Sequence, residues 1–183
     1  MKLLKISALA IASALSLGAC DASGVTDPGG LRVGQFDGRI AGTLDARLDG
    51  QAVSGSTVSG FHDIIVLTDY ARGIEVTLYH DTNEFYEGRF SIGDAVLMNR
   101  PIVAYVRLLD TGEYFDSLHG VIDLYGVRRG GISGTATFRA ESDRVVGDVV
   151  DVDVSFVTDY AGNISYNLSP SFSTSGKSAP GEA

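Results

Sequence analysis

The sequence predicts an all-β fold: an antiparallel β-sandwich of about nine or ten strands or, as the alternative, a closed β-barrel. Two observations support this prediction. After residue 35, apolar and polar residues alternate with a period of two, as in strands that bury one face. No stretch of the same part keeps an apolar period of 3.6 over three turns, so helices are not expected.

The first predicted strands lie at residues 40–48 and 52–58. In residues 40–48, apolar or small side chains fall on one face and mostly charged ones on the other. Between the two segments, Asp49-Gly50 favours the positive φ angles of a two-residue hairpin turn. We therefore expect a tight hairpin at this point.

The alternation returns later in the chain, at residues 74–78, 134–140 and 150–156. Residues typical of turns separate the apolar segments, at 82–83, 110–112, 130–131 and 147–148. This spacing is typical of a domain whose strands follow one another through short connections.

A four-residue echo predicts two further hairpins. Thr68-Asp69-Tyr70-Ala71 and Thr158-Asp159-Tyr160-Ala161 both follow an apolar segment and lead through glycine into a second one. If the first turn pairs Thr68 with Ile74, the register places His62 opposite His80. If the second turn also closes a hairpin, the folded domain extends to about Leu168.

The N-terminus has the layout of an export signal. Lys2 and Lys5 precede an uncharged apolar stretch at residues 6–17, which small residues follow. This stretch is shorter than the about 20 residues that a membrane-spanning helix needs. Leu17-Gly18-Ala19-Cys20 resembles the lipobox of bacterial lipoproteins. The resemblance implies removal of residues 1–19, a lipid (diacylglyceryl and palmitate-type acyl chains) on Cys20, and attachment to a membrane.

Composition sets the remaining boundaries. Residues 20–35 are rich in Gly, Ser and Asp and predict a lipidated flexible tether, residues 36–168 the all-β domain, and residues 169–183 a disordered tail. Cys20 is the only cysteine, so the domain has no disulfide. Loss of Lys2 and Lys5 with the signal leaves 12 basic against 23 acidic residues, a formal charge of −11. A surface this acidic repels nucleic acid, and no nucleic-acid partner is expected.

Four residues are candidates for a metal site. His62 and His80 form a cross-strand pair in the predicted register and could bind a transition metal. Asp151 and Asp153 alternate along an expected strand and offer oxygen ligands of the kind that Ca²⁺ prefers. The simpler interpretation is that the histidines close the open end of a hairpin and that the two aspartates lie on the solvated face of a strand.

Three motifs resemble a family of small all-β lipoproteins of Bacteroidetes type. They are Gly88-Arg89-Phe90-Ser91-Ile92-Gly93, Tyr114-Phe115-Asp116-Ser117 and Ile132-Ser133-Gly134-Thr135, and the similarity spans about residues 35–156. The resemblance implies an immunoglobulin-like or barrel-like domain of unknown function. It implies no catalytic residue.

We therefore expect a non-enzymatic lipoprotein of the cell envelope, anchored to the outer membrane or to the periplasmic face of the inner membrane. Its domain would bind a protein, a glycan or a small ligand, or serve structurally, and no cofactor is expected. One alternative is a metal-dependent or hydrolytic enzyme that uses His62 and His80. Another is a carrier of an apolar ligand, which requires a cavity lined by residues such as Val66, Val76 and Phe138.

Overall fold

The computed structural model describes residues 30–57, 63–80, 85–93, 102–128 and 131–164. Every regular element in these ranges is a β-strand, so the predicted all-β fold of nine or ten strands is confirmed. The strands are β1 (Gln35–Gly42), β2 (Ala46–Thr57), β3 (Asp63–Asp69), β4 (Ile74–His80), β5 (Gly88–Gly93), β6 (Ile102–Leu108), β7 (Tyr114–Arg128), β8 (Gly131–Ser142), β9 (Val149–Val157) and β10 (Asp159–Ile164).

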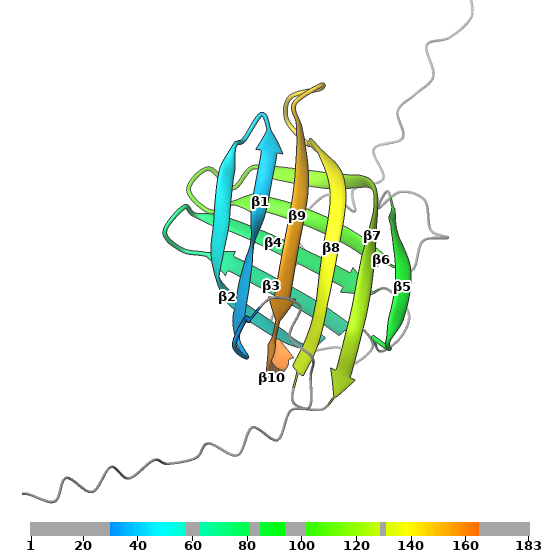
Figure 1. Ribbon diagram of the computed structural model, residues 1–183. Helices are drawn as coiled ribbons and strands as arrows, with labels where there is room; N and C mark the ends of the chain where they lie inside the picture. The colour runs from blue at the N-terminus through cyan, green and yellow to red at the C-terminus, as the bar shows by residue number, and fades with distance from the viewer. Residues whose placement is uncertain (1–29, 58–62, 81–84, 94–101, 129–130, 165–183) are drawn as a thin grey trace, which may run out of the picture.

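The ten strands form one mixed sheet in the order β1-β9-β8-β7-β5-β6-β4-β3-β2-β10. Further pairings join β1 to β2 and β6 to β7, so that the hydrogen bonds run from β2 back to β1. Figure 1 shows the result: β1, β9, β8 and β7 form a front layer that crosses in front of β3, β4 and β6. The sheet thus folds over and encloses a core between two layers.

Two of the pairings are parallel, which corrects the expectation of a purely antiparallel sheet. Both follow from the strands around them. Because β5 and β6 each pair antiparallel with β7, they run parallel to each other. Because β9 runs antiparallel to β1 and β1 runs antiparallel to β2, a strand that continues β9 meets β2 in parallel. β10 is that strand.

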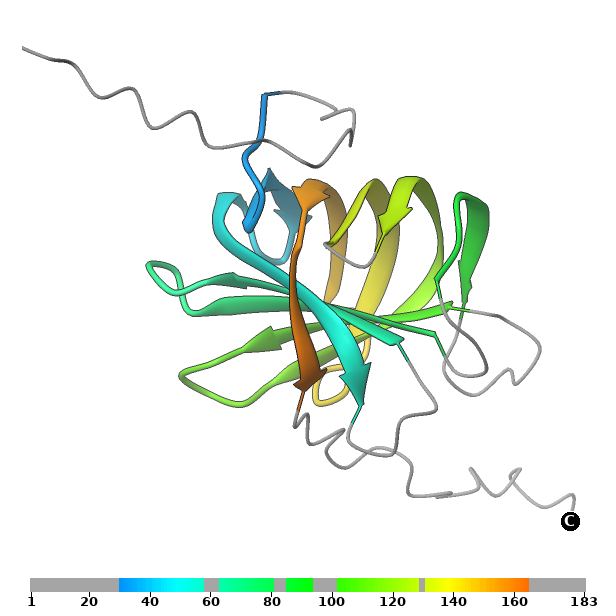
Figure 2. The same ribbon diagram turned by 90° about the horizontal axis from the view of Figure 1, so that it is seen from below.

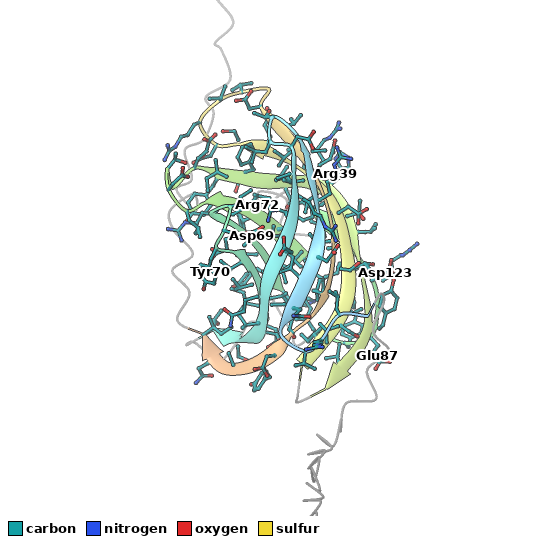
Figure 3. All side chains as sticks on the ribbon, turned by 60° about the vertical axis from the view of Figure 1, so that its left-hand side comes forward. Arg39, Asp69, Tyr70, Arg72, Glu87 and Asp123 are labelled. Atoms are coloured by element: carbon teal, nitrogen blue, oxygen red, sulfur yellow. The ribbon has the colours of Figure 1, made fainter. Side chains whose placement is uncertain are left out.

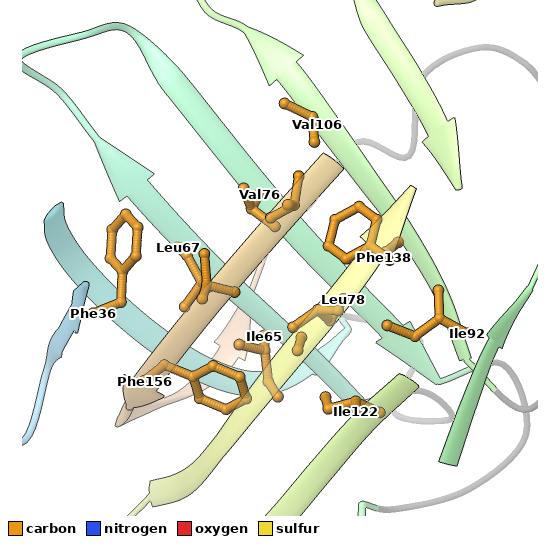
Figure 4. Close-up of a cluster of buried hydrophobic side chains, with 14 of the residues drawn as sticks. Phe36, Ile65, Leu67, Val76, Leu78, Ile92, Val106, Ile122, Phe138 and Phe156 are labelled. Carbon is orange, nitrogen blue, oxygen red and sulfur yellow. The ribbon is translucent and has the colours of Figure 1, made fainter. Parts of the chain in front are cut away.

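The core lies between the two layers and consists of the inward side chains of both. Phe36, Phe138 and Phe156 of the front layer meet side chains of β3, β4 and β6 (Figure 4). All of these side chains are buried. At about 1.5 to 3 kcal/mol for each large apolar side chain, this burial is the main stabilising contribution to a chain without disulfides. The inward residues of the back layer that Figure 4 labels are Ile65, Leu67, Val76, Leu78 and Val106.

The predicted turn at Asp49-Gly50 is wrong. Both residues lie inside β2, and the chain turns earlier, between Gly42 and Ala46. Gly50 lies where β2 ends its pairing with β1 and begins its pairing with β3. A Cβ on Gly50 would meet the Phe36 ring at 3.1 Å and the carbonyl oxygen of Thr68. The glycine is needed there for close packing and not for a turn.

The hairpin predicted after Thr68 is present as β3–β4, but its register differs by one residue. Asp69 pairs with Ile74, and Thr68 pairs with Glu75. The connection therefore consists of residues 70–73 and is one residue shorter than the sequence suggested. Because side chains alternate between the faces of a strand, a shift of one residue changes which side chains lie opposite each other.

The second copy of the echo does not form a hairpin, which corrects that prediction. After Thr158 the chain continues as β10 beside β2, as Figure 2 shows. The two copies differ at the residue after the echo. In the first copy this residue is Arg72, which binds Asp69 across the turn. In the second copy it is Gly162, which has no side chain to bind Asp159. β10 ends at Ile164, so the predicted domain end at Leu168 lies outside the described residues.

Candidate functional site

The predicted pair of histidines depends on a register that the protein does not adopt. Asp63, and not His62, lies opposite His80. His62 itself is outside the described residues. The hypothesis of a cross-strand site built on His62 and His80 therefore loses the geometry on which it was based.

His80 is the last residue of β4 and is only 3% exposed. Its ring meets the rings of Phe85 and Phe90 edge to face, with centroids 5.6 and 6.4 Å away. Asp63, opposite His80, accepts hydrogen bonds from the Ser56 hydroxyl at 3.0 Å and from the backbone N–H of Phe85 at 2.9 Å. These contacts close one end of the sheet. They give His80 the environment of a packed core residue.

The two aspartates proposed as Ca²⁺ ligands lie on the outer face of β9, as the sequence suggested. Asp151 forms a bidentate pair with Arg139 of β8, with both N–O distances 2.7 Å. The hydrogen bonds from Arg139 lower the pKa of the Asp151 carboxyl, and the nearby His119 acts in the same direction. Asp153 is 3.4 Å from the Thr137 hydroxyl. The oxygens of Asp151 are thus directed at a guanidinium, which takes the place that a cation would need.

Within the described ranges, no group of three or more His, Cys, Asp and Glu side chains could hold a metal ion. The acidic side chains of the front layer are instead distributed in pairs with arginine. Arg47 binds Asp37 at 2.7 Å and Arg89 binds Asp123 at 2.7 Å. Exposed pairs of this kind are screened by solvent, so they organise the surface more than they stabilise the fold.

The carrier hypothesis named Val66, Val76 and Phe138 as residues around one cavity. Val76 and Phe138 belong to the buried core cluster. Val66 is on the opposite face of β3, because its neighbours Ile65 and Leu67 are the ones that point inward. The three side chains therefore do not line a common space.

The outer face of β7 carries a feature that the sequence analysis missed. Val121 and Tyr125 are 40% and 48% exposed, and Asp123 lies between them in the strand. Arg89 of β5 holds Asp123 through two hydrogen bonds of 2.7 and 2.8 Å, which lower the pKa of the Asp123 carboxyl. The Tyr125 hydroxyl is 3.2 Å from the Thr135 hydroxyl of β8. We call Val121, Asp123, Tyr125 and Arg89 the β7 patch.

Figure 3 places this patch at the edge of the molecule, where Asp123 and Glu87 project away from the side that carries Tyr70. The patch lies on the outside of a curved sheet and is not a pocket. It combines an aliphatic side chain, an aromatic ring with a hydroxyl and a fixed ion pair. Such a surface suits contact with another macromolecule better than the enclosure of a small molecule.

Comparison with protein-family models, with curated proteins and with solved structures gave no match. In the described residues no helix is long and apolar enough to cross a membrane. Cys20, the predicted lipidation site, is outside the described residues.

Proposed function

We propose that the chain is a lipoprotein of the bacterial cell envelope. In this proposal residues 1–19 are removed on export, Cys20 carries the lipid, and residues 20–35 hold the β-domain close to the membrane. The observation that supports it most is Leu17-Gly18-Ala19-Cys20 directly after an apolar export signal. The strands are compatible with cleavage after residue 19, because the first of them, β1, begins only at Gln35. No strand pairing of the described residues, including the one that joins β1 to β2, uses a residue before it.

Lipid labelling of intact cells tests the anchor. Wild-type chain should incorporate labelled palmitate and fractionate with membranes, because two or three acyl chains exceed the marginal anchoring that one chain gives. Cys20→Ser should do neither. A matched control moves the thiol by combining Cys20→Ser with Ser23→Cys, and this chain should also stay unlabelled. Membrane association of Cys20→Ser at the wild-type level would overturn the proposal.

We further propose that the domain acts by binding a partner protein through the β7 patch, and not by catalysis. The support is the exposure of Val121 and Tyr125 beside the fixed pair Arg89–Asp123. Aromatic and arginine side chains are enriched at protein interfaces, and Tyr offers contact area at low entropic cost. An exposed patch that combines an aromatic side chain with a fixed arginine has the composition of a protein interface, and this is the reason to favour a protein over a glycan.

A photo-crosslinking amino acid at position 125 in intact cells tests this second proposal. It should give a discrete adduct that disappears when Val121→Ser is added. The same crosslinker at Val146, an equally apolar and even more exposed position in the β8–β9 connection, is the control and should give none. Absence of an adduct from position 125, or equal adducts from both positions, would contradict the binding role of the patch.

A further inference from the structure

The chain enters the β-domain at a fixed point, directly before β1. The backbone N–H of Gly34 donates to the carbonyl oxygen of Val157 in β9 at 2.7 Å, and the Gly34 carbonyl oxygen accepts the N–H of Ala52 in β2 at 2.9 Å. Two hydrogen bonds of 3.0 and 3.1 Å between Arg32 and Gln35 close a turn at the same place. Whatever holds the N-terminal segment therefore holds the domain by this end of β1, which is the lower end in Figure 1.

The β7 patch begins at the same end of the front layer. The registers form one row across its four strands: Gln35 lies opposite Val157, Val157 opposite Ser133, and Ser133 opposite Gly126 of β7. Tyr125 directly precedes Gly126 in the strand. At about 4.8 Å between neighbouring strands, the row from β1 to β7 measures about 14 Å. Tyr125 is therefore at the level at which the chain enters the domain.

From Tyr125 the patch extends along β7 and away from the entry level. Asp123 lies in the row of Asp37, and Val121 lies in the row of Arg39. These rows are two and four residues beyond the entry row, so Val121 is about 14 Å above it at about 3.4 Å per residue. The connection between β8 and β9 is at the opposite end of the layer (Figure 1). The patch thus occupies the half of the front layer that adjoins the entry point.

The proposed lipid anchor keeps this half within a limited distance of the membrane. Residues 20–31 are 12 residues long. A chain spans at most about 3.3 to 3.6 Å per residue, so this segment reaches at most about 40 Å, whatever its conformation. Tyr125 lies about 14 Å further along the sheet. Its distance from the bilayer therefore does not exceed about 55 Å.

The β7 patch is small for an interface that forms between freely diffusing proteins. It consists of two exposed side chains and one ion pair, whereas an interface of standard size involves about 20 to 30 residues on each side. Smaller interfaces belong to weak and transient complexes. Two partners that are confined together meet at a high effective concentration, which compensates for weak affinity. A membrane that anchors both partners provides this confinement.

We propose that the partner of the β7 patch is a protein held in the same membrane as Cys20, which rests on both the lipid anchor and the binding role proposed above. The part of this partner outside the bilayer contacts Val121 and Tyr125 with an apolar surface and the Arg89–Asp123 pair with polar groups. A protein fits better than the lipid surface itself. The chain without residues 1–19 has a formal charge of −11, and anionic headgroups repel it.

Photo-crosslinking from position 125 in cells that contain one of three chains tests the shared membrane. The first chain is lipidated in the ordinary way. In the second, a cleavable secretory signal replaces residues 1–20 and releases residues 21–183 in soluble form. In the third, the signal and lipidated cysteine of an unrelated lipoprotein precede residues 21–183. At equal abundance we expect a protein adduct from the first and third chains, and an adduct weaker by about tenfold or more from the second.

The soluble chain should keep its fold, because the strands begin only at Gln35. Equal urea midpoints of the purified soluble and lipidated chains check this. An adduct of equal intensity from the soluble chain would overturn the shared membrane and leave the binding role of the β7 patch intact. A lipid adduct in place of a protein adduct would also overturn it, since the patch would then contact the bilayer. No adduct from the lipidated chain would overturn both this inference and the proposed binding role.

Discussion

The carboxylate of Asp69 accepts a hydrogen bond of 2.7 Å from the guanidinium of Arg72, three residues later, although Asp69 itself is only 1% exposed. The same carboxylate accepts the backbone N–H of Arg72 at 3.0 Å and that of Asp49 at 3.2 Å. Arg72 also binds the Asp49 side chain at 2.9 Å. One buried acid thus fixes the β3–β4 turn and attaches it to β2.

We predict that Asp69→Ala destabilises the domain by about 2 to 3 kcal/mol, because the N–H groups of Asp49 and Arg72 and the Arg72 guanidinium lose their charged acceptor. Urea unfolding of the variant and wild type measures the loss. Asp159→Ala is the matched control, since Asp159 holds the same place in the echo but is exposed. Its effect should stay within about 0.5 kcal/mol. Equal effects of the two substitutions would show that Arg72 does not use Asp69 as described.

The same residue predicts how stability depends on pH. Burial of the Asp69 carboxyl raises its pKa, but the hydrogen bonds from Arg72 and from the Asp49 backbone outweigh this effect, so that the pKa lies below its ordinary value of 3.8. A folded pKa below the unfolded one contributes stability above the unfolded pKa, and this contribution is lost as pH falls through the folded pKa.

Unfolding free energies measured from neutral pH down to acid should therefore fall less steeply in Asp69→Asn than in wild type. Asp151→Asn provides the comparison. The pKa of Asp151 is also lowered by its arginine partner, but that pair is exposed and screened by solvent. Loss of this pair in Asp151→Asn should leave the fall of the unfolding free energy at acid pH almost unchanged. If the unfolding free energies of Asp69→Asn and wild type fall equally steeply at acid pH, Asp69 is not the source of this pH dependence.

The all-β class was predictable because strands that bury one face impose a period of two on the sequence. The register and the turns were not predictable by the same means. Asp49-Gly50 has the composition of a hairpin turn, yet the Phe36 ring packs where a side chain on Gly50 would be. The two copies of the echo share four residues, but only the first has an arginine placed to bind its aspartate. Specific side-chain contacts, and not the composition of the turn, decided both cases.

Gly50→Ala tests the packing explanation directly. The new Cβ would press against the Thr68 carbonyl oxygen and the Phe36 ring. Because a backbone atom cannot move aside as the tip of a side chain can, we expect a loss of about 3 kcal/mol in urea unfolding. Gly112→Ala has open space around it and changes only a residue with φ of 66°, so about 1 to 2 kcal/mol is expected. A smaller loss for Gly50→Ala than for Gly112→Ala would favour a conformational over a packing role.

The candidate site was less predictable than the fold, since sites depend on which outward side chains become neighbours. A register error of one residue was enough to pair His80 with His62 in place of Asp63. The alternation along β7 does not by itself show which of its residues face outward, because irregularities in the β7–β8 pairing fall between Ser117 and His119 and between Leu124 and Gly126. Each irregularity shifts the inward and outward positions of the strand. The signal that remains in the sequence is the alternation of Val121, Asp123 and Tyr125.

The buried hydrogen bond between Ser54 and Thr158 provides a last prediction. Both side chains are almost fully buried, their hydroxyls are 2.7 Å apart, and the Thr158 hydroxyl also accepts the backbone N–H of Ile132 at 2.8 Å. Thr158 therefore joins β2 to β8 at the point where β9 gives way to β10. Thr158→Val should cost about 1 to 3 kcal/mol, since it leaves the N–H of Ile132 and the Ser54 hydroxyl without this partner.

A double-mutant cycle measured by urea unfolding separates the two bonds. Ser54→Ala alone should cost about 1 kcal/mol, and the double variant should cost less than the sum, because the Ser54 hydroxyl is no longer left unpaired. The bond to Ile132 is lost in both Thr158 variants and cancels from the coupling term. Strict additivity would mean that Ser54 and Thr158 do not interact, and the junction of β9 and β10 would then depend on the Ile132 bond alone.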